Sequence, residues 1–341
     1  MNQRCLAAGL TAVVAVSAAG ATAVGQSAAA QARTEWGHPD LQGLWTNDTF
    51  TPLQRPPSLA GKEFFTPEEA AELTRVLTAD GVDPLAPNAL AALADPKRSE
   101  RLLQGKEDIH YDNSLWLTEK FRKGLSTLRT SLIVDPASGR IPPLTPEAQK
   151  REAARAAAMK GRAFDDPESR PLGERCIIWP HEGPPMLPAP YNNVIQIFQT
   201  PEYVIILQEI IHNARIIPLD RHSHLSPSVR QLSGDSLGHW EGDTLVVETT
   251  NFTGKTRFQG STETLRVIER FTRADADTID YRFTVDDPDT WTRPWTAAIP
   301  MMKIDDSRLF EYACHEGNYD LENILRSART REREAREAAR K

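Results

Sequence analysis

The sequence is poor in cysteine, and it lacks the glycine motifs that mark many enzyme classes. It holds three cysteines in 341 residues. There is no phosphate-binding P-loop, no dinucleotide fingerprint, no Gly-x-Ser-x-Gly and no recognisable Ser/His/Asp arrangement. After residue 32 no stretch is long or apolar enough for a membrane-spanning helix. These absences argue against nucleotide-dependent enzymes, serine hydrolases of the usual kind and helical membrane proteins.

The chain also has fewer basic residues than acidic ones. The chain carries 40 Lys and Arg against 47 Asp and Glu, a formal net charge of −7. An acidic balance argues against nucleic acid or an anionic membrane surface as a partner. We therefore expect the partner to be a small-molecule substrate.

Residues 1–32 have the pattern of a secretory signal peptide. A basic start containing Arg4 precedes an apolar run rich in alanine and glycine, which ends in Ala-Ala-Ala-Gln-Ala. This order is typical of a leader that is cleaved on export. The alternative, a membrane anchor, fits poorly because the run is only weakly apolar. We expect a periplasmic or secreted bacterial protein with no membrane anchor after cleavage.

Two cysteines remain after the leader, Cys176 and Cys314. In an oxidising compartment the simplest expectation is a disulfide between them. Such a bridge closes a loop of more than about a hundred residues, worth at most roughly 4–5 kcal/mol in the chain-entropy view. The alternative is two buried thiols.

The first half of the chain predicts one strand followed by covering segments. Gly43-Leu44-Trp45 resembles the opening of lipocalin-like barrels, in which the tryptophan belongs to the core. Thr66-Pro-Glu-Glu69 is a capping box that begins a helix ending near residue 78, and Thr145-Pro-Glu147 begins another that ends near Lys160. Further short helices are expected at residues 88–94, 99–105 and 114–123, with Pro-rich extended chain at 51–62.

From residue 175 onward the pattern changes to short β-type runs separated by turn residues. Helices alternating with parallel strands are absent, which excludes Rossmann and TIM architectures. We predict a mainly β fold, an antiparallel up-and-down lipocalin-like β-barrel with a helical, Pro-rich N-terminal wrapping. The expected strands are residues 176–179, 193–199, 203–217, the 234–257 hairpin, 265–273, 278–285, 291–302 and 308–315.

The predicted organisation has four parts. Residues 1–32 are the leader, and residues 33–170 hold the first strand with the Pro-rich and helical wrapping. Residues 171–320 form the barrel, and residues 321–341 form a charged C-terminal helix. Within the barrel, the hairpin Gly234 to Arg257 is the best-defined unit, because Glu241-Gly242-Asp243 supplies turn chemistry between β-rich runs.

Several expected strands carry one charged residue in an otherwise apolar row. Glu269 shares a face with Val267 and Phe271, and Glu248 lies in the β-branched run after Gly242. A barrel interior lined in this way would hold ionisable groups with shifted pKa values, suited to acid–base chemistry. The alternative is that these charges lie on the solvent face.

The densest group of chemical side chains is Tyr312-Ala-Cys-His-Glu-Gly-Asn-Tyr319. A Cys176–Cys314 bridge would bring His315 and Glu316 near His181, which follows Cys176 by five residues. We predict these three as the proton-transfer group, assisted by His212 or Glu248. The alternative is that His315 lies on the surface at the end of a strand. The remaining candidates are expected to orient the substrate: Arg257, Arg293, Asn251, Trp295, Tyr312 and Asn318.

Metal binding is a further alternative. His222-Ser-His224 has the i, i+2 spacing that places two imidazoles on one side of an extended segment. A third ligand would have to come from His212, His181 or a carboxylate. We predict no metal and no cofactor, and keep a metal-dependent hydrolase as a second alternative.

The segments GDSLGHWEGDTLVVETTNFTGKTRF, ERFTR, DPDTWTRPW and YACHEGNY resemble a family of secreted bacterial proteins without an assigned function. The resemblance covers residues 39 to about 329 and implies a barrel similar to lipocalins. Cofactor-free lyases, isomerases and cyclases occur on such barrels, an analogy of fold alone. We therefore predict a lyase or dehydratase acting on a small apolar, aromatic molecule; the alternative is a lipocalin-like carrier.

Overall fold

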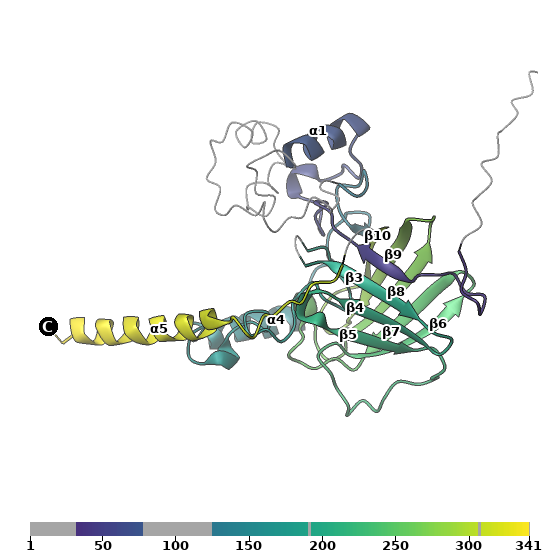
Figure 1. Ribbon diagram of the computed structural model, residues 1–341. Helices are drawn as coiled ribbons and strands as arrows, with labels where there is room; N and C mark the ends of the chain where they lie inside the picture. Colours follow the sequence, from purple (N-terminus) through teal and green to yellow (C-terminus); the bar gives the residue numbers. More distant parts are fainter. Residues whose placement is uncertain (1–31, 78–124, 190–191, 306–307, 341) are drawn as a thin grey trace, which may run out of the picture. The chain divides into compact units, whose positions relative to one another are not determined.

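A ten-stranded antiparallel sheet, curled into a nearly closed barrel, forms the centre of the structure (Figure 1). The structure is a computed structural model that describes residues 32–77, 125–189, 192–305 and 308–340. The mainly β prediction is therefore confirmed. The strands are β1 (Gly43–Thr46), β2 (Ile133–Asp135), β3 (Val194–Gln199), β4 (Tyr203–Gln208), β5 (Ala214–Pro218), β6 (Asp235–Glu241), β7 (Thr244–Thr250), β8 (Arg266–Arg273), β9 (Thr278–Asp286) and β10 (Trp295–Lys303).

Within each of two meanders the strands follow one another around the barrel in chain order, and β1 joins the two. β3, β4 and β5 form one meander, and β6 to β10 form a second. β1 lies between β3 and β10 and pairs antiparallel with both, while β2 pairs with the first part of β10. This arrangement agrees with the predicted up-and-down topology.

The barrel closes between β5 and β6 without a ladder of hydrogen bonds between these two described strands. Gly238 on β6 makes close packing possible there. A Cβ atom at this position would come within 2.7 Å of Leu219 and 2.9 Å of Ile217. Only glycine leaves room for both side chains, so the gap in the sheet is filled by packing instead of backbone pairing.

The barrel interior is a filled apolar core. Trp45 and Trp295 are fully buried, as are Phe271, Tyr281 and Phe283. Their rings pack tilted or edge-to-face, with centroids 4.9 Å apart for Phe271 and Tyr281 and 5.8 Å for Phe283 and Trp295. The prediction that Trp45 belongs to the core is confirmed. Trp295, predicted to contact substrate, is instead a core residue.

Three α-helices lie among the described residues: α1 (Pro67–Leu77), α4 (Pro146–Met159) and α5 (Tyr319–Ala338). The predicted capping box forms, since Thr66 Oγ1 accepts a hydrogen bond from Glu69 N at 3.2 Å and Glu69 Oε2 accepts one from Thr66 N at 2.8 Å. Thr145 caps α4, since its Oγ1 accepts a hydrogen bond from Ala148 N at 3.1 Å. Short 3₁₀ turns occur at Pro57–Leu59, Pro167–Ser169, Ile210–His212 and Phe258–Gly260. The helices predicted at 88–94, 99–105 and 114–123 lie outside the described residues.

Two predicted strands are wrong, and each has a physical reason. Residues 176–179 form a turn, a bend and irregular chain, because Cys176 has a positive φ of 55° that a strand does not accept. Residues 308–315 do not pair with β10, because both of its edges are occupied. β9 lies along one side, and β1 and β2 share the other.

A third prediction, a single strand at 203–217, is also wrong. The segment folds back on itself as β4 and β5, with Ile211 at φ 59° in the turn. The turn changes which residues share a face. In a single strand Gln208 and Arg215 would lie on opposite faces, because side chains alternate along a strand. In the structure both line one small cavity.

The predicted disulfide between Cys176 and Cys314 is present, with a sequence separation of 138 residues. It connects the loop before β3 to the segment after β10. Among the described residues no helix is long and apolar enough to cross a membrane. The disulfide is compatible with a secreted or periplasmic protein. The leader itself lies outside the described residues.

Replacing both cysteines, as Cys176→Ser with Cys314→Ser, should destabilise the protein by about 4–5 kcal/mol, because the unfolded chain gains the freedom of a long open loop. Urea unfolding followed by tryptophan fluorescence measures this change. The wild type in reducing agent is the matched control and should unfold at the same urea concentration as the variant. An unchanged midpoint in the variant would contradict the assigned role of the bridge.

Candidate functional site

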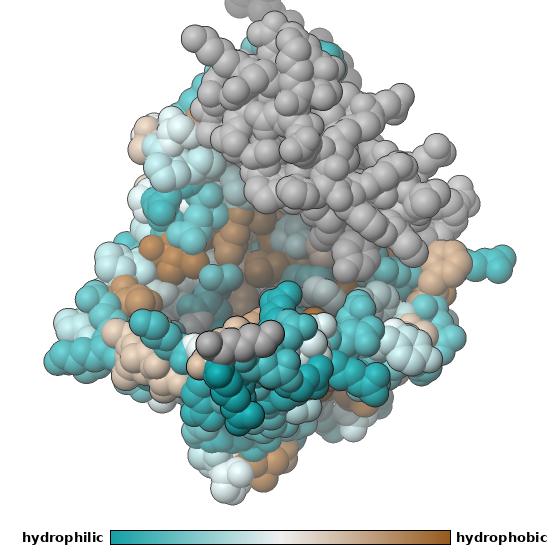
Figure 2. All heavy atoms as spheres, turned by 90° about the vertical axis from the view of Figure 1, so that its left-hand side faces the viewer, coloured by the Kyte–Doolittle hydropathy of each residue, from teal (hydrophilic) through white to brown (hydrophobic). Residues whose placement is uncertain are grey.

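A cleft of about 870 Å³ lies beside the barrel, between α4, the loop 168–188 and the loop 254–260. Its volume is within the range of small-molecule sites. Leu144, Leu187 and Phe258 line it and also pack against the barrel core. The face seen in Figure 2 is hollowed near its centre, with apolar residues inside the hollow and polar residues around it. We call the space of about 870 Å³ the arginine cleft, for the residues Arg155, Arg170, Arg175 and Arg257 in its lining.

Of the residues predicted to transfer protons, His181 lines the arginine cleft. Its Nε2 atom is buried and has no hydrogen-bond partner. Burial lowers the pKa of this imidazole to about 4, so the ring is neutral at ordinary pH. A neutral imidazole with an unpartnered nitrogen is able to accept a proton from a bound molecule.

The loop that carries His181 is fixed to the barrel. Met186 N donates a hydrogen bond to Tyr281 Oη at 2.9 Å, and Leu187 N donates one to His181 O at 2.9 Å. Gly183 has φ +90°, and a Cβ there would come within 2.7 Å of Pro185. The loop therefore needs glycine at this position, and its shape sets where His181 lies.

Tyr281 belongs to a buried charged network inside the barrel. The Arg215 guanidinium contacts both carboxylate oxygens of Glu269, at 2.6 and 3.3 Å, and Tyr281 Oη donates to Glu269 at 2.8 Å. The Glu269 side chain is fully buried and that of Arg215 is 12% exposed. Burial and the neighbouring carboxylate raise the pKa of the Tyr281 phenol. The expectation of ionisable groups inside the barrel holds for this acid and this arginine.

Glu182 was not among the residues predicted from the sequence, yet the structure places it in a second, small polar cavity. This cavity is lined by Gln208, Asn213, Arg215 and Ser233 as well. One carboxylate oxygen of Glu182 accepts a hydrogen bond from Trp179 N at 3.1 Å, and the other is buried without a partner. Burial raises the pKa of Glu182 to about 7. The two neighbours His181 and Glu182 thus have pKa values displaced in opposite directions.

Arg257 enters the arginine cleft from a loop that is held in a strained shape. Its backbone is left-handed, with φ 45°, and its guanidinium contacts Glu152 of α4 at 2.5 Å. The Nε atom of Arg257 is buried and has no hydrogen-bond partner. A non-glycine residue in this conformation is uncommon and often marks a functional site.

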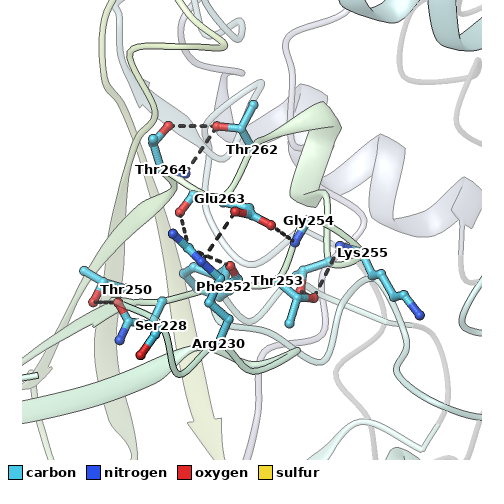
Figure 3. A network of polar contacts seen from close by, with 12 residues as sticks. Ser228, Arg230, Thr250, Phe252, Thr253, Gly254, Lys255, Thr262, Glu263 and Thr264 are labelled. Carbon is cyan, nitrogen blue, oxygen red and sulfur yellow. Dashed lines mark hydrogen bonds and ion pairs between the residues drawn. The ribbon is translucent and has the colours of Figure 1, made fainter. Parts of the chain in front are cut away.

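The start of that loop is fixed by Arg230 and Glu263 (Figure 3). Arg230 Nη1 donates to the carbonyl oxygens of Phe252 and Glu263, at 3.1 and 3.0 Å. The Glu263 carboxylate accepts from Gly254 N at 3.2 Å. These bonds position the segment 254–257, which carries Lys255 and Arg257 into the lining of the cleft.

His315 and Glu316 do not join His181. Both are exposed, and neither lines a described cavity. Tyr312 and Asn318 line a different hollow, of about 660 Å³, beside the disulfide. Asn318 also begins α5, where its side chain accepts from Leu321 N and donates to Glu174 O. The bridge brings the two segments close, but the turn after Cys314 directs His315 to solvent.

The other predicted residues have structural contacts away from the arginine cleft. Glu248 is ion-paired with Arg266, which lowers its pKa, and it lies 3.4 Å from His224. Asn251 holds a loop by donating to Leu225 O and Ser226 O, at 3.0 and 3.2 Å.

Arg293 is an exposed partner of Asp135 at 2.7 Å. The backbone of His212 lies in the turn between β4 and β5.

The two histidines of His222-Ser-His224 have different surroundings. His222 is exposed, whereas His224 Nδ1 lies 2.8 Å from Asp235. Within the described ranges, no group of three or more His, Cys, Asp and Glu residues is placed to hold a metal ion.

No protein family, curated protein or solved structure matches the chain. The resemblance to secreted bacterial proteins stays a prediction, and the function has to be argued from the arginine cleft itself.

Replacing the acid as Glu182→Gln should remove a pH-dependent cost of folding. The folded protein holds the Glu182 proton up to about pH 7, whereas the unfolded chain releases it near 4.5. Wild-type stability is therefore lost as pH rises from 4.5 to 7, by about 3 kcal/mol at most from this residue. Urea midpoints measured from pH 4.5 to 8 should show that the stability of the variant rises relative to that of the wild type as pH increases from 4.5 to 7.

Asp48 adds a second pH-dependent contribution of the same sign, because burial also raises its pKa to about 7. The Asp48 contribution is common to the wild type and Glu182→Gln, so it cancels in their difference. A constant difference between the two proteins over the whole pH range would show that Glu182 ionises normally in the folded state.

Proposed function

We propose that the protein is a cofactor-independent enzyme, a lyase or dehydratase, that binds a small, largely aromatic molecule in the arginine cleft. The observation that supports this best is that His181, a residue of the cleft lining, is neutral and has a buried Nε2 atom without a hydrogen-bond partner. The cleft combines this base with an apolar floor and with guanidinium groups. Those are the parts that proton abstraction beside an electron-withdrawing group requires.

The proposed reaction is an elimination. His181 Nε2 takes a proton from a carbon of the substrate, and the C–H electron pair becomes the new double bond as the C–O bond of a hydroxyl or ether breaks. The imidazolium then returns the proton to the departing oxygen, which leaves as water or an alcohol. Arg257, another residue of the lining, stabilises the negative charge that develops on the substrate in this reaction. No other reactant is needed, and the enzyme regains its starting state.

Burial of His181 makes the proposed base weak, and this has a consequence for the pH profile. A histidine with a pKa of about 4 is unprotonated down to that pH, whereas an exposed one gains its proton near 6.5. The enzyme should therefore keep its base in the active form through mildly acidic conditions.

His181→Gln should abolish turnover, by on the order of 10²–10⁴-fold, and leave ligand binding within a few-fold of the wild type. Substrates are found by incubating the purified protein with a panel of hydroxylated aromatic compounds, aromatic ethers and steroids and detecting loss of water or alcohol by mass spectrometry. In the wild type, kcat for a substrate so found should fall only as pH approaches 4. His315→Gln, at an exposed residue outside the cavities, is the matched control.

A fall of kcat already near pH 6.5, or full activity in His181→Gln, would be incompatible with His181 as the base.

A second function, that of a binding protein, is favoured by one observation. Of His181, His315 and Glu316, the residues predicted to act together, only His181 lines the cleft. A binding protein would hold ligands from the panel unchanged, and His181→Gln would then alter neither binding nor any product.

A further inference from the structure

The arginine cleft is strongly cationic, although the chain as a whole is acidic. Five cationic residues line it, against two carboxylates, Glu152 and Glu168. The whole chain has a net charge of −7. A positive site on a negative protein concentrates anions locally, because the lining field opposes that of the surrounding surface.

The carboxylates of the lining are already engaged. Glu152 binds Arg257, and Glu168 binds Arg175 at 2.5 Å with Lys255 at 3.8 Å. Arg170 is neutralised by Glu174, outside the lining.

Arg155 of α4 is exposed, and its side chain forms no hydrogen bond or ion pair with another residue in the part of the chain that the structure describes. It lines the same cleft as Lys255, which is 71% exposed and 3.8 Å from a carboxylate already bound to Arg175. These two cations are left to a ligand.

Two buried N–H groups in the lining also have no acceptor. They belong to the Nε1 atom of Trp179 and the Nε atom of Arg257. A buried donor without a partner costs about 1–3 kcal/mol. An oxygen-bearing anion in the cleft would supply acceptors, while Leu144, Leu187 and Phe258 give its floor an apolar surface.

We propose that the ligand of the arginine cleft is the carboxylate of an aromatic acid, with its charge near Arg155 and Lys255 and its ring on the apolar floor. This rests on the proposed function and specifies its substrate class. A single carboxylate fits Arg155 and Lys255, the two lining cations that have no carboxylate partner of their own, since Lys255 shares Glu168 with Arg175. A ring fits a floor made of leucine and phenylalanine side chains. The charge of the substrate then determines which molecules enter the arginine cleft, and the barrel interior takes no part in that selection.

The test is isothermal titration calorimetry of the full chain with 2-naphthoate and with 2-naphthamide, which has the same ring without the charge. The acid should bind at least about tenfold more tightly than the amide at low salt, and the advantage should shrink as salt is raised. Arg155→Gln combined with Lys255→Gln should remove the advantage and leave amide binding unchanged. Arg282→Gln, an exposed arginine paired with Asp280 on β9, is the matched control and should behave as the wild type.

Equal binding of acid and amide, failure of both to bind, or tighter binding of 2-naphthyl phosphate than of 2-naphthoate would overturn this assignment. Titration of His181→Gln separates it from the enzyme proposal. If naphthoate binds both the wild type and His181→Gln and no compound of the panel is converted, the ligand class stands and the enzyme proposal fails. If panel compounds are converted but the acid has no advantage over the amide, the ligand class fails alone.

Discussion

The buried carboxylate of Glu269 is the constraint on which the rest of the structure depends. A charge in a filled apolar barrel is tolerated only when it is paired and hydrogen-bonded. Arg215 supplies the opposite charge and Tyr281 a hydroxyl donor. The same hydroxyl accepts from Met186 N, so the group that satisfies the carboxylate also fixes the loop that carries His181. Barrel and cleft are therefore connected by one phenol oxygen.

The fixed loop explains why two adjacent residues have such different properties. His181 lies in the wall of the arginine cleft, and Glu182 lies in the polar cavity against Arg215. Both are largely removed from water, which favours the neutral form of each. For an imidazole this means a lowered pKa, and for a carboxyl a raised one. A base and an acid thus arise side by side from a single physical cause.

Local sequence signals predicted the barrel well. The turn at Glu241-Gly242-Asp243 and the alternation on both sides of it specify the β6–β7 hairpin, and the capping box at Thr66 specifies the start of α1. One wrong prediction has a long-range cause. Whether residues 308–315 could join the sheet depended on the edges of β10 being free, which no local pattern reveals.

The candidate site was harder to predict than the fold. His181 was found because it follows Cys176 in a stiff, Pro-rich loop. His315 was chosen for its position beside Cys314, but a disulfide fixes the neighbourhood of a segment and not the direction of its side chains. Glu182 was missed because its burial depends on Met186 bonding to a residue 95 positions away. The face of Arg215 depended on a turn at Ile211 that contains neither glycine nor proline.

The position of β1 has a consequence for how the chain assembles. This four-residue strand lies between β3 and β10, so one of its two neighbours is the last strand to be synthesised. Until residue 303 is available, Trp45 has a wall on one side only, and the meanders on either side of it remain unjoined. Completion of the ring is therefore a late, long-range event, whereas each hairpin forms among near neighbours. Pairing of β1 with β10, the first and last strands described, therefore completes the sheet.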